Sequence, residues 1–193
     1  MTQRKRRRRR LFALVSAGMA DAAIAAWDLK FLTPVDLWRP STAIHNAASV
    51  GNAGTQADTN WRPLSHDRNG VSFDPCFPAY VSGHATFGGA WSRVLEDEFS
   101  GTDYTNPFPL TLTTEDPHAT LAPPAVGFVT RSFDSFTEAA EENALSRIWL
   151  GVHYRIDATG GLATGRSVAT DVGASALRWT QKCAGWTCGE AIP

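Results

Sequence analysis

Residues 146–157 read Ser-Arg-Ile-Trp-Leu-Gly-Val-His-Tyr-Arg-Ile-Asp and place three chemically distinct side chains in a mostly apolar segment. Arg147 is followed six residues later by His153 and four further by Asp157. Arginine is a permanent cation whose N–H donors match tetrahedral oxyanions. Histidine can act as a nucleophile, a metal ligand or an acid–base group, and a nearby carboxylate can fix its tautomer. Taken alone, the segment also fits a surface arginine and an aspartate that caps the next helix.

Two upstream segments add side chains of the same kind. Residues 77–84 read Phe-Pro-Ala-Tyr-Val-Ser-Gly-His, and Lys30 precedes the dipeptide Arg39-Pro40. In this order the three segments resemble the signature of vanadium-dependent haloperoxidases and PAP2-type acid phosphatases. The resemblance covers about residues 11–180. The residues around the three segments are similar to those of the bacterial haloperoxidase-like branch. Relatives of this kind carry a substantial helical portion before their lysine segment, so the chain resembles a C-terminal half.

The resemblance implies a site for a tetrahedral oxyanion. Lys30, Arg39 and Arg147 would neutralise its equatorial oxygens. Ser82 would donate its hydroxyl, and Gly83 would donate its backbone N–H from the start of a helix, where unpaired N–H groups favour an anion. Each of these residues also has an ordinary structural role open to it, as a cap, a packing glycine or a solvated charge.

The resemblance also implies the reacting groups. His153 would be the axial partner, a ligand to vanadium in a haloperoxidase or the nucleophile in a phosphatase. His84 would be the acid–base group beside the apical oxygen. Asp157 would either orient His153 or cap the following helix. Trp27 and Phe77 occupy positions that place aromatic groups near the oxyanion, where a halide would react, although both also suit a core.

The implied cofactor is vanadate, and the implied reaction is oxidation of a halide by hydrogen peroxide to hypohalous acid. An acid phosphatase that hydrolyses phosphate esters through a phosphohistidine is the alternative on the same residues, with phosphate in place of vanadate. The third alternative is an inactive, truncated remnant that persists as a helical interaction module. A homo-oligomer is compatible with each, and an extracytoplasmic location is favoured by the resemblance.

One spacing departs from the signature. Eight residues separate Lys30 from Arg39, whereas the family has six. On a regular helix seven positions return to the same face and nine reach the opposite one. We therefore expect the chain to leave the helix at Thr33-Pro34, so that both cations can face one anion.

Composition and charge limit the classes of partner. The 193 residues suffice for one domain with its own core. Seven of the 18 Lys and Arg residues lie within residues 4–10, and the remaining 11 face 19 acidic residues, a balance of −8. This acidic body argues against nucleic acid as a partner. The basic start followed by apolar residues 11–20 imitates a secretory signal, but a helix of the enzyme itself fits equally, and no run of 18 apolar residues predicts a membrane span.

The pattern of apolar residues, caps and breakers predicts an all-α helical bundle over residues 11–180. We expect a disordered basic N-terminus at residues 1–10, a flexible tail at residues 181–193, and no strands. Ser82 and the Ser135-x-x-Glu138 capping box mark two helix starts. The helices are expected at residues 11–29, 40–48, 83–99, 136–150 and 157–179, with a loop at residues 51–75.

Overall fold

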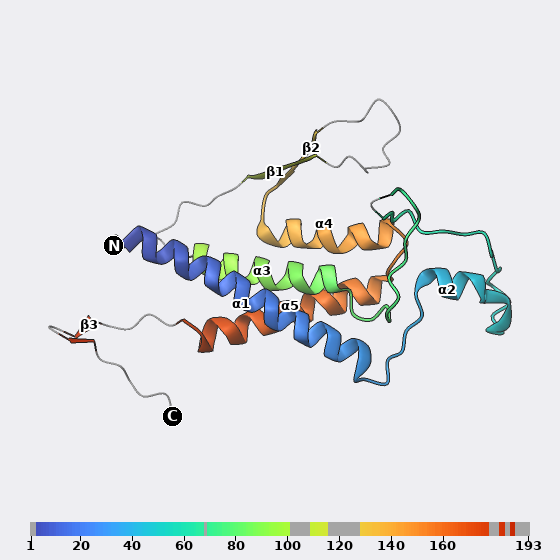
Figure 1. Ribbon diagram of the computed structural model, residues 1–193, viewed down its shortest axis with the longest axis horizontal. Coiled ribbons are helices and arrows are strands. Elements are labelled where there is room, and N and C mark those ends of the chain that lie inside the picture. The colour runs from blue at the N-terminus through green and yellow to red at the C-terminus, as the bar shows by residue number, and fades with distance from the viewer. Residues whose placement is uncertain are drawn as a thin grey trace.

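The computed structural model describes residues 3–67, 69–100, 109–115, 128–177, 182–183 and 186–187. In these residues α3 is the central helix, and it contacts α1, α4 and α5 (Figure 1). The helical bundle predicted from the sequence is confirmed. The helices are α1 (Gln3–Phe31), α2 (Pro40–His45), a 3-10 turn (Ala47–Ser49), α3 (Gly83–Phe99), α4 (Phe136–Trp149) and α5 (Arg155–Ser175).

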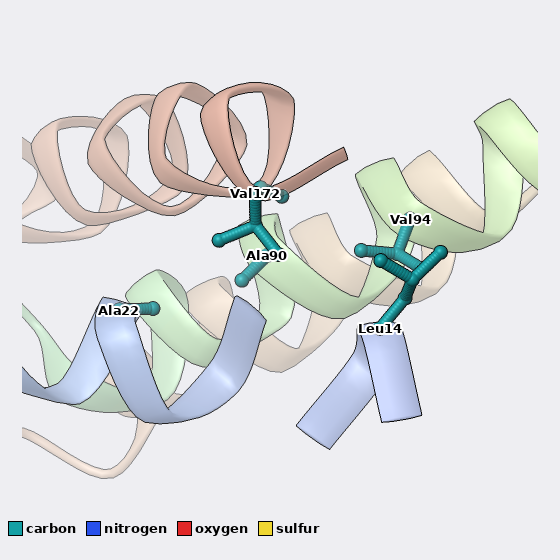
Figure 2. Packing of buried hydrophobic residues seen from close by; sticks show 6 residues of the cluster. Leu14, Ala22, Ala90, Val94 and Val172 are labelled. Carbon is teal, nitrogen blue, oxygen red and sulfur yellow. The ribbon is translucent and has the colours of Figure 1, made fainter. Parts of the chain in front are cut away.

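Helix α1 packs on the bundle from Leu14 to its end. Every fourth residue in this part is buried, in the order Leu14, Gly18, Ala22, Ala26 and Lys30. Residues four apart are neighbours on the helix surface, so the buried residues form one continuous stripe that winds around the helix. Leu14 and Ala22 join Ala90 and Val94 of α3 and Val172 of α5 in the main apolar cluster (Figure 2). The stripe therefore begins in the apolar core and ends at a buried lysine.

Helices α3 and α5 approach one another so closely that they require glycine at the contact. A Cβ atom on Gly165 would lie 1.9 Å from the carbonyl oxygen of Thr86, and one on Gly89 would lie 2.3 Å from that of Leu162. Side chains cannot occupy such positions unless the backbones move apart. This close contact fixes the start of α3 relative to the start of α5.

Side-chain caps mark the starts of α3 and α4 at the positions predicted from the sequence. The Ser82 hydroxyl oxygen accepts the Ala85 N–H at 3.4 Å and caps α3. At α4, the Ser135 hydroxyl oxygen accepts the Glu138 N–H at 2.9 Å, while the Glu138 carboxylate accepts the N–H of Asp134. Capping groups of this kind satisfy N–H donors that the first helical turn leaves free.

The prediction that the chain has no strands is wrong. Strands β1 (Leu110–Glu115) and β2 (Phe128–Phe133) pair antiparallel, and β3 (Lys182–Cys183) and β4 (Trp186–Thr187) form a second short pair. Threonine and aromatic residues fit a pleated strand. Hydroxyl contacts across the first pair join Thr111 to Ser132. The prolines within residues 101–130 suggested a loop and concealed the two strands.

Helix α1 begins at Gln3, so the expectation of disorder at residues 1–10 is wrong for residues 3–10. Arginine is a good helix former, and α1 continues through this run. Arg10 also pairs with the Glu98 carboxylate and donates to the Leu177 carbonyl at 2.8 Å, which ties the first turns to α3 and to the residues after α5. The predicted flexible tail lies outside the described residues, apart from β3 and β4.

By length and composition alone, the part of α1 from Lys5 to Phe31 could cross a membrane, which the sequence analysis did not expect. An N-terminal signal and the core helix of a soluble protein meet the same criterion. In the described residues, α1 packs on α3 and α5.

Candidate active site

The structure gathers the predicted cations and histidines at one end of the bundle. Each side chain comes from the end of a helix or from the residues beside it. They are Lys30 near the end of α1, Arg39 before α2, Ser82 and His84 at the start of α3, Arg147 near the end of α4, and His153 before α5.

The extra residues between Lys30 and Arg39 are looped out, as the sequence analysis expected. Helix α1 ends at Phe31, since Pro34 has no N–H to donate to the Lys30 carbonyl four residues back. The Lys30 ammonium then donates to the carbonyls of Pro78 at 2.8 Å and Ala79 at 3.3 Å. Burial, together with the charge of Arg39, lowers the pKa of Lys30 to about 8. Both cations therefore reach the same region despite the unusual spacing.

Arg39 connects the loop before α3 with the segment before α5. Its Nε donates to the Phe77 carbonyl at 2.8 Å, and one Nη1 hydrogen is directed to the Val152 carbonyl at 2.7 Å. The same nitrogen lies 3.1 Å from Nε2 of His153. Only 6% of Arg39 is exposed, and burial lowers the pKa of its guanidinium.

The partners of His153 determine its tautomer. Its Nδ1 lies 3.0 Å from the Asp157 carboxylate, which can only accept, so Nδ1 carries the proton. Its Nε2 faces a donor of Arg39, so this nitrogen carries the lone pair. Burial lowers the pKa of His153 although the hydrogen bond to Asp157 acts in the opposite direction. A neutral imidazole whose Nε2 lone pair faces Arg39 follows from these contacts.

Asp157 combines the two roles that the sequence left open, with one correction. The cap residue of α5 is Tyr154, and Asp157 occupies the third helical position. Its Oδ2 accepts the Tyr154 N–H at 2.9 Å and also the Nδ1 proton of His153. One carboxylate oxygen thus begins the helix and orients the histidine.

Arg147 and the start of α3 add further polar groups to this end of the bundle, where the charge of Arg147 acts on Arg39 and on His84. Burial lowers the pKa of Arg147, and its Nε is buried without a partner. Ser82 is fully buried, and its N–H donates to the Asp157 carbonyl at 3.0 Å. Gly83 is the first residue of α3, so its N–H has no carbonyl acceptor within the helix. The Ser82 hydroxyl hydrogen remains able to donate, because its oxygen uses only a lone pair to cap α3.

His84 lies close enough to Arg147 and His153 to be influenced by both. Although the residue as a whole is exposed, desolvation by the surrounding protein lowers its pKa to about 4, and the two neighbours contribute in the same direction. His84 is therefore neutral near pH 7. In this form it can accept a proton from a group bound beside it.

Trp27 and Phe77 lie beside the cations. Their ring centroids are 5.5 Å apart, and Trp27 also packs over the backbone of Gly83. The Phe77 ring is contacted by Lys30 at 4.9 Å and by Arg39 at 4.8 Å from its centroid. Attraction between cations and ring faces helps to hold both positive side chains in place.

The balance of charge and hydrogen bonding favours an anion here. Lys30, Arg39 and Arg147 are three buried or half-buried cations at this end of the bundle, and the charges of two carboxylates, Asp74 and Asp157, act on Arg39. The Nη2 of Arg39 and the Nε of Arg147 are buried donors without partners in the described structure. Buried polar groups are normally hydrogen-bonded, and buried cations are normally paired. A tetrahedral oxyanion would satisfy both needs, whereas no group of three or more His, Cys, Asp and Glu residues suited to a metal ion occurs in the described part of the chain.

Sequence reasoning missed two parts of this site. The carbonyls of Phe77, Pro78 and Ala79 receive the cations, and backbone acceptors have no signature in side-chain motifs. Asp74 was also missed: it accepts a hydrogen bond from the Ser41 hydroxyl, and its charge acts on Arg39. Its position, three residues before the Phe77 segment, was the available signal that Asp74 lies near the site.

Comparisons with known proteins agree with this arrangement. The family profile described as the VCPO second helical-bundle domain matches residues 10–182. The chain is 34% identical to the vanadium chloroperoxidase of Curvularia inaequalis over 179 residues, 77% of this chain and 28% of that protein.

Two solved structures are similar. A bacterial vanadium-dependent iodoperoxidase shares 32% identity at a TM-score of 0.59, over 85% of this chain and 32% of that one. An apo-type bacterial vanadium-dependent chloroperoxidase, at 20% identity and a TM-score of 0.56 over 78% of this chain and 32% of that one, has the same fold. The chain thus spans about a third of the length of these proteins.

Proposed function

Because the chain belongs to the vanadium chloroperoxidase family, through its second helical-bundle domain, we propose that it is a vanadate-dependent haloperoxidase that oxidises a halide with hydrogen peroxide. The proposed product is hypohalous acid. The named activities of the relatives support this class of reaction.

The observation that carries the proposal is the setting of His153. Its Nδ1 is held by Asp157 at 3.0 Å, and its Nε2 faces Arg39, while the charge of Lys30 also acts on the ring. Neutral imidazole is a common ligand of transition metals, and a second partner on the other nitrogen raises its basicity. A nitrogen donor surrounded by cations suits a metal oxyanion that is both coordinated and negatively charged.

The residues present fit vanadate. The two unpartnered donors, Arg39 Nη2 and Arg147 Nε, would bind its oxygens, together with the Ser82 hydroxyl and the Gly83 N–H. His153 would hold it through Nε2. Vanadate bound there would act as a Lewis acid that activates hydrogen peroxide toward the halide.

The protein's own residues would bind, orient and move protons. The three cations would stabilise negative charge in a site that is largely withdrawn from water, where such interactions are strong. His84, neutral above a pKa of about 4, would accept the proton that hydrogen peroxide releases on binding. Trp27 and Phe77 would provide the aromatic surface at which the halide reacts.

The same geometry supports a second candidate, an acid phosphatase. A neutral His153 with its lone pair on Nε2 and a carboxylate on Nδ1 is also the arrangement of a nucleophile that attacks phosphorus. Phosphate esters would then occupy the position proposed for vanadate. The third candidate is the inactive helical module considered from the sequence, and the experiment below includes it.

One experiment compares all three candidates. The purified full chain is loaded with orthovanadate and assayed for peroxide-dependent bromination, and the vanadate-free chain is assayed for phosphate-ester hydrolysis. The proposal predicts bromination that requires both vanadate and His153, with His153→Ala as the matched inactive variant. Hydrolysis without bromination would establish the phosphatase, and the absence of both activities would favour the remnant.

A further inference from the structure

Side chains along the outer face of α1 are exposed although most of them are apolar or small. We define this outer face by Phe12, Ser16, Ala20, Ile24 and Phe31, which lie four or seven positions apart and so share one side of the helix. Phe12, Ile24 and Phe31 are 71%, 70% and 57% exposed in the described part of the chain. A contiguous apolar patch of this kind usually marks an interaction surface.

Charge is divided between the two ends of α1. Residues 1–20 contain no aspartate or glutamate, and Arg6 and Arg8 are exposed near the start of the helix. Residues 11–31 contain one basic residue, the buried Lys30, whereas Asp21 and Asp28 are exposed. The dipole of a helix favours acidic groups at its start and basic groups at its end, so these exposed charges do not stabilise α1 by itself.

A second copy of α1 in antiparallel orientation complements this division of charge. When the two copies cross midway between Ser16 and Ala20, Phe12 of one copy lies level with Ile24 of the other. The short side chains of Ser16 and Ala20 let the two helices approach closely. The two helix dipoles then point in opposite directions, which is the favourable arrangement for neighbouring helices.

The same packing brings opposite charges together. Arg6 and Asp28 are 22 positions apart, so they lie only about 40° from one another around the helix axis. A twofold axis places groups on the same side of the outer face opposite one another, so Arg6 of one copy meets Asp28 of the other, and the pair forms twice. The remaining offset of two residues, about 3 Å along the axis, is within the reach of an arginine side chain. Within the described residues, neither side chain has an ion pair in its own chain.

A membrane surface fits the outer face less well than a second copy does. The basic start of α1 would attract anionic headgroups, but the carboxylates of Asp21 and Asp28 would be repelled by them. A helix that lies in a lipid interface carries its cations along the whole polar face rather than at one end.

We propose that the outer face of α1 is a homodimer interface in which two copies pack antiparallel and pair Arg6 with Asp28. The dimer does not depend on the proposed function, because it uses none of the groups that would hold the oxyanion. It does affect the candidate site, since Trp27, which packs over Gly83, is 41% exposed on the same side of α1. The second copy would therefore cover the aromatic wall of the site and reduce its access to water.

Sedimentation equilibrium of the full chain at low ionic strength, over micromolar concentrations, measures the dissociation constant of the dimer. Ile24→Asp should weaken the dimer at least about tenfold, because it buries a charge opposite Phe12. Trp149→Asp is the matched control, since Trp149 is 58% exposed on α4, which packs on α3 and α5. Because Ile24 is 70% exposed in one copy, the melting temperature of the monomer should be the same in Ile24→Asp and the wild type.

Charge reversal tests the antiparallel arrangement, and it remains decisive if Ile24→Asp does not fold. Arg6→Glu and Asp28→Arg should each weaken the dimer at least about threefold, because each creates like-charged pairs, and the double variant should recover the wild-type affinity within about twofold. A chain that stays monomeric at every concentration would overturn the proposal, as would a dimer that Ile24→Asp leaves unchanged or that the double variant does not restore. A monomer that cosediments with phosphatidylglycerol vesicles would assign the outer face to a membrane instead.

Discussion

The helices α1, α3 and α5 bury apolar side chains at one end and charged side chains at the other. At one end Leu14, Ala90, Val94 and Val172 bury apolar surface among residues of matching size. At the other end Lys30 and its neighbours are buried with polar atoms that lack partners. A buried unsatisfied polar group costs about 1–3 kcal/mol, so the second end does not stabilise the fold without a ligand. The apolar end and the glycine contacts hold in place a set of charges that would otherwise separate.

The largest expected effect concerns chemistry at the charged end. Replacing His84 with alanine should lower peroxide-dependent turnover about 10²–10⁴-fold, the usual contribution of a positioned acid–base group. Vanadate affinity and the melting temperature should change little, because His84 is exposed and is not the proposed vanadium ligand. Steady-state bromination and vanadate titration measure the two effects. His66→Ala, in the loop before α3, is the control, and turnover unchanged in His84→Ala would remove His84 from the mechanism.

The glycine contact between α3 and α5 should be measurable as stability. Gly165→Ala introduces a Cβ atom 1.9 Å from a backbone oxygen, so the free energy of unfolding should fall by about 3 kcal/mol. Gly173→Ala is the matched control in the same helix, since nothing lies within 4 Å of its Cβ position. That variant should gain up to about 1 kcal/mol from helix propensity. Urea denaturation of both variants decides the matter, and equal midpoints would contradict the close contact of α3 and α5.

Lys30 joins the two ends, because it continues the buried stripe of α1. Lys30→Ala should weaken vanadate binding about ten- to a hundredfold, as expected for the loss of a charge-assisted hydrogen bond. Lys5→Ala, at the exposed start of the same helix, should leave affinity unchanged. Deletion of the exposed residues Val35 and Asp36 should preserve affinity, because the segment is already looped out. A loss below about twofold in Lys30→Ala would remove Lys30 from the site.

The pH dependence of binding gives the smallest expected effect. The pKa of Lys30 is lowered to about 8, so below pH 8 the ammonium is charged and its contribution to anion binding is fully present. Above pH 8 binding must take up a proton, and affinity should fall by up to about tenfold for each pH unit. Phosphate and vanadate titrate themselves, so the quantity measured is the difference between the wild type and Lys30→Met, which lacks this group. Parallel pH profiles for the two proteins would show that Lys30 does not titrate at the site.

Much of the charged end could be predicted from the sequence. The order and spacing of Lys30, Arg39, Ser82, Arg147 and His153 predicted that they meet, and the structure brings them together. Pro34 predicted the break that compensates for the longer spacing, because its missing N–H ends α1. Short-range caps at Ser82 and Ser135 placed the starts of α3 and α4 for the same reason: their effect is local.

The remaining features depend on contacts that no local pattern contains. The pairing of β1 with β2 joins segments separated by more than ten residues, and strand preference depends strongly on such context. Arg10 is helical partly because Glu98 and Leu177 lie beside it in space. Asp157 was expected either to orient His153 or to cap the helix. Tyr154 occupies the cap, and the Asp157 carboxylate, in the first turn of α5, lies 3.0 Å from the Nδ1 of His153.

The central claim is that His153 holds a vanadium oxyanion through Nε2, and calorimetric titration of orthovanadate tests it most directly. The wild type and His153→Ala are compared at pH 7, with the His66→Ala variant as control. The account predicts that His153→Ala binds vanadate at least about a hundredfold more weakly, because the coordinating nitrogen is lost while the three cations remain. Equal vanadate affinity in the wild type and His153→Ala would contradict it.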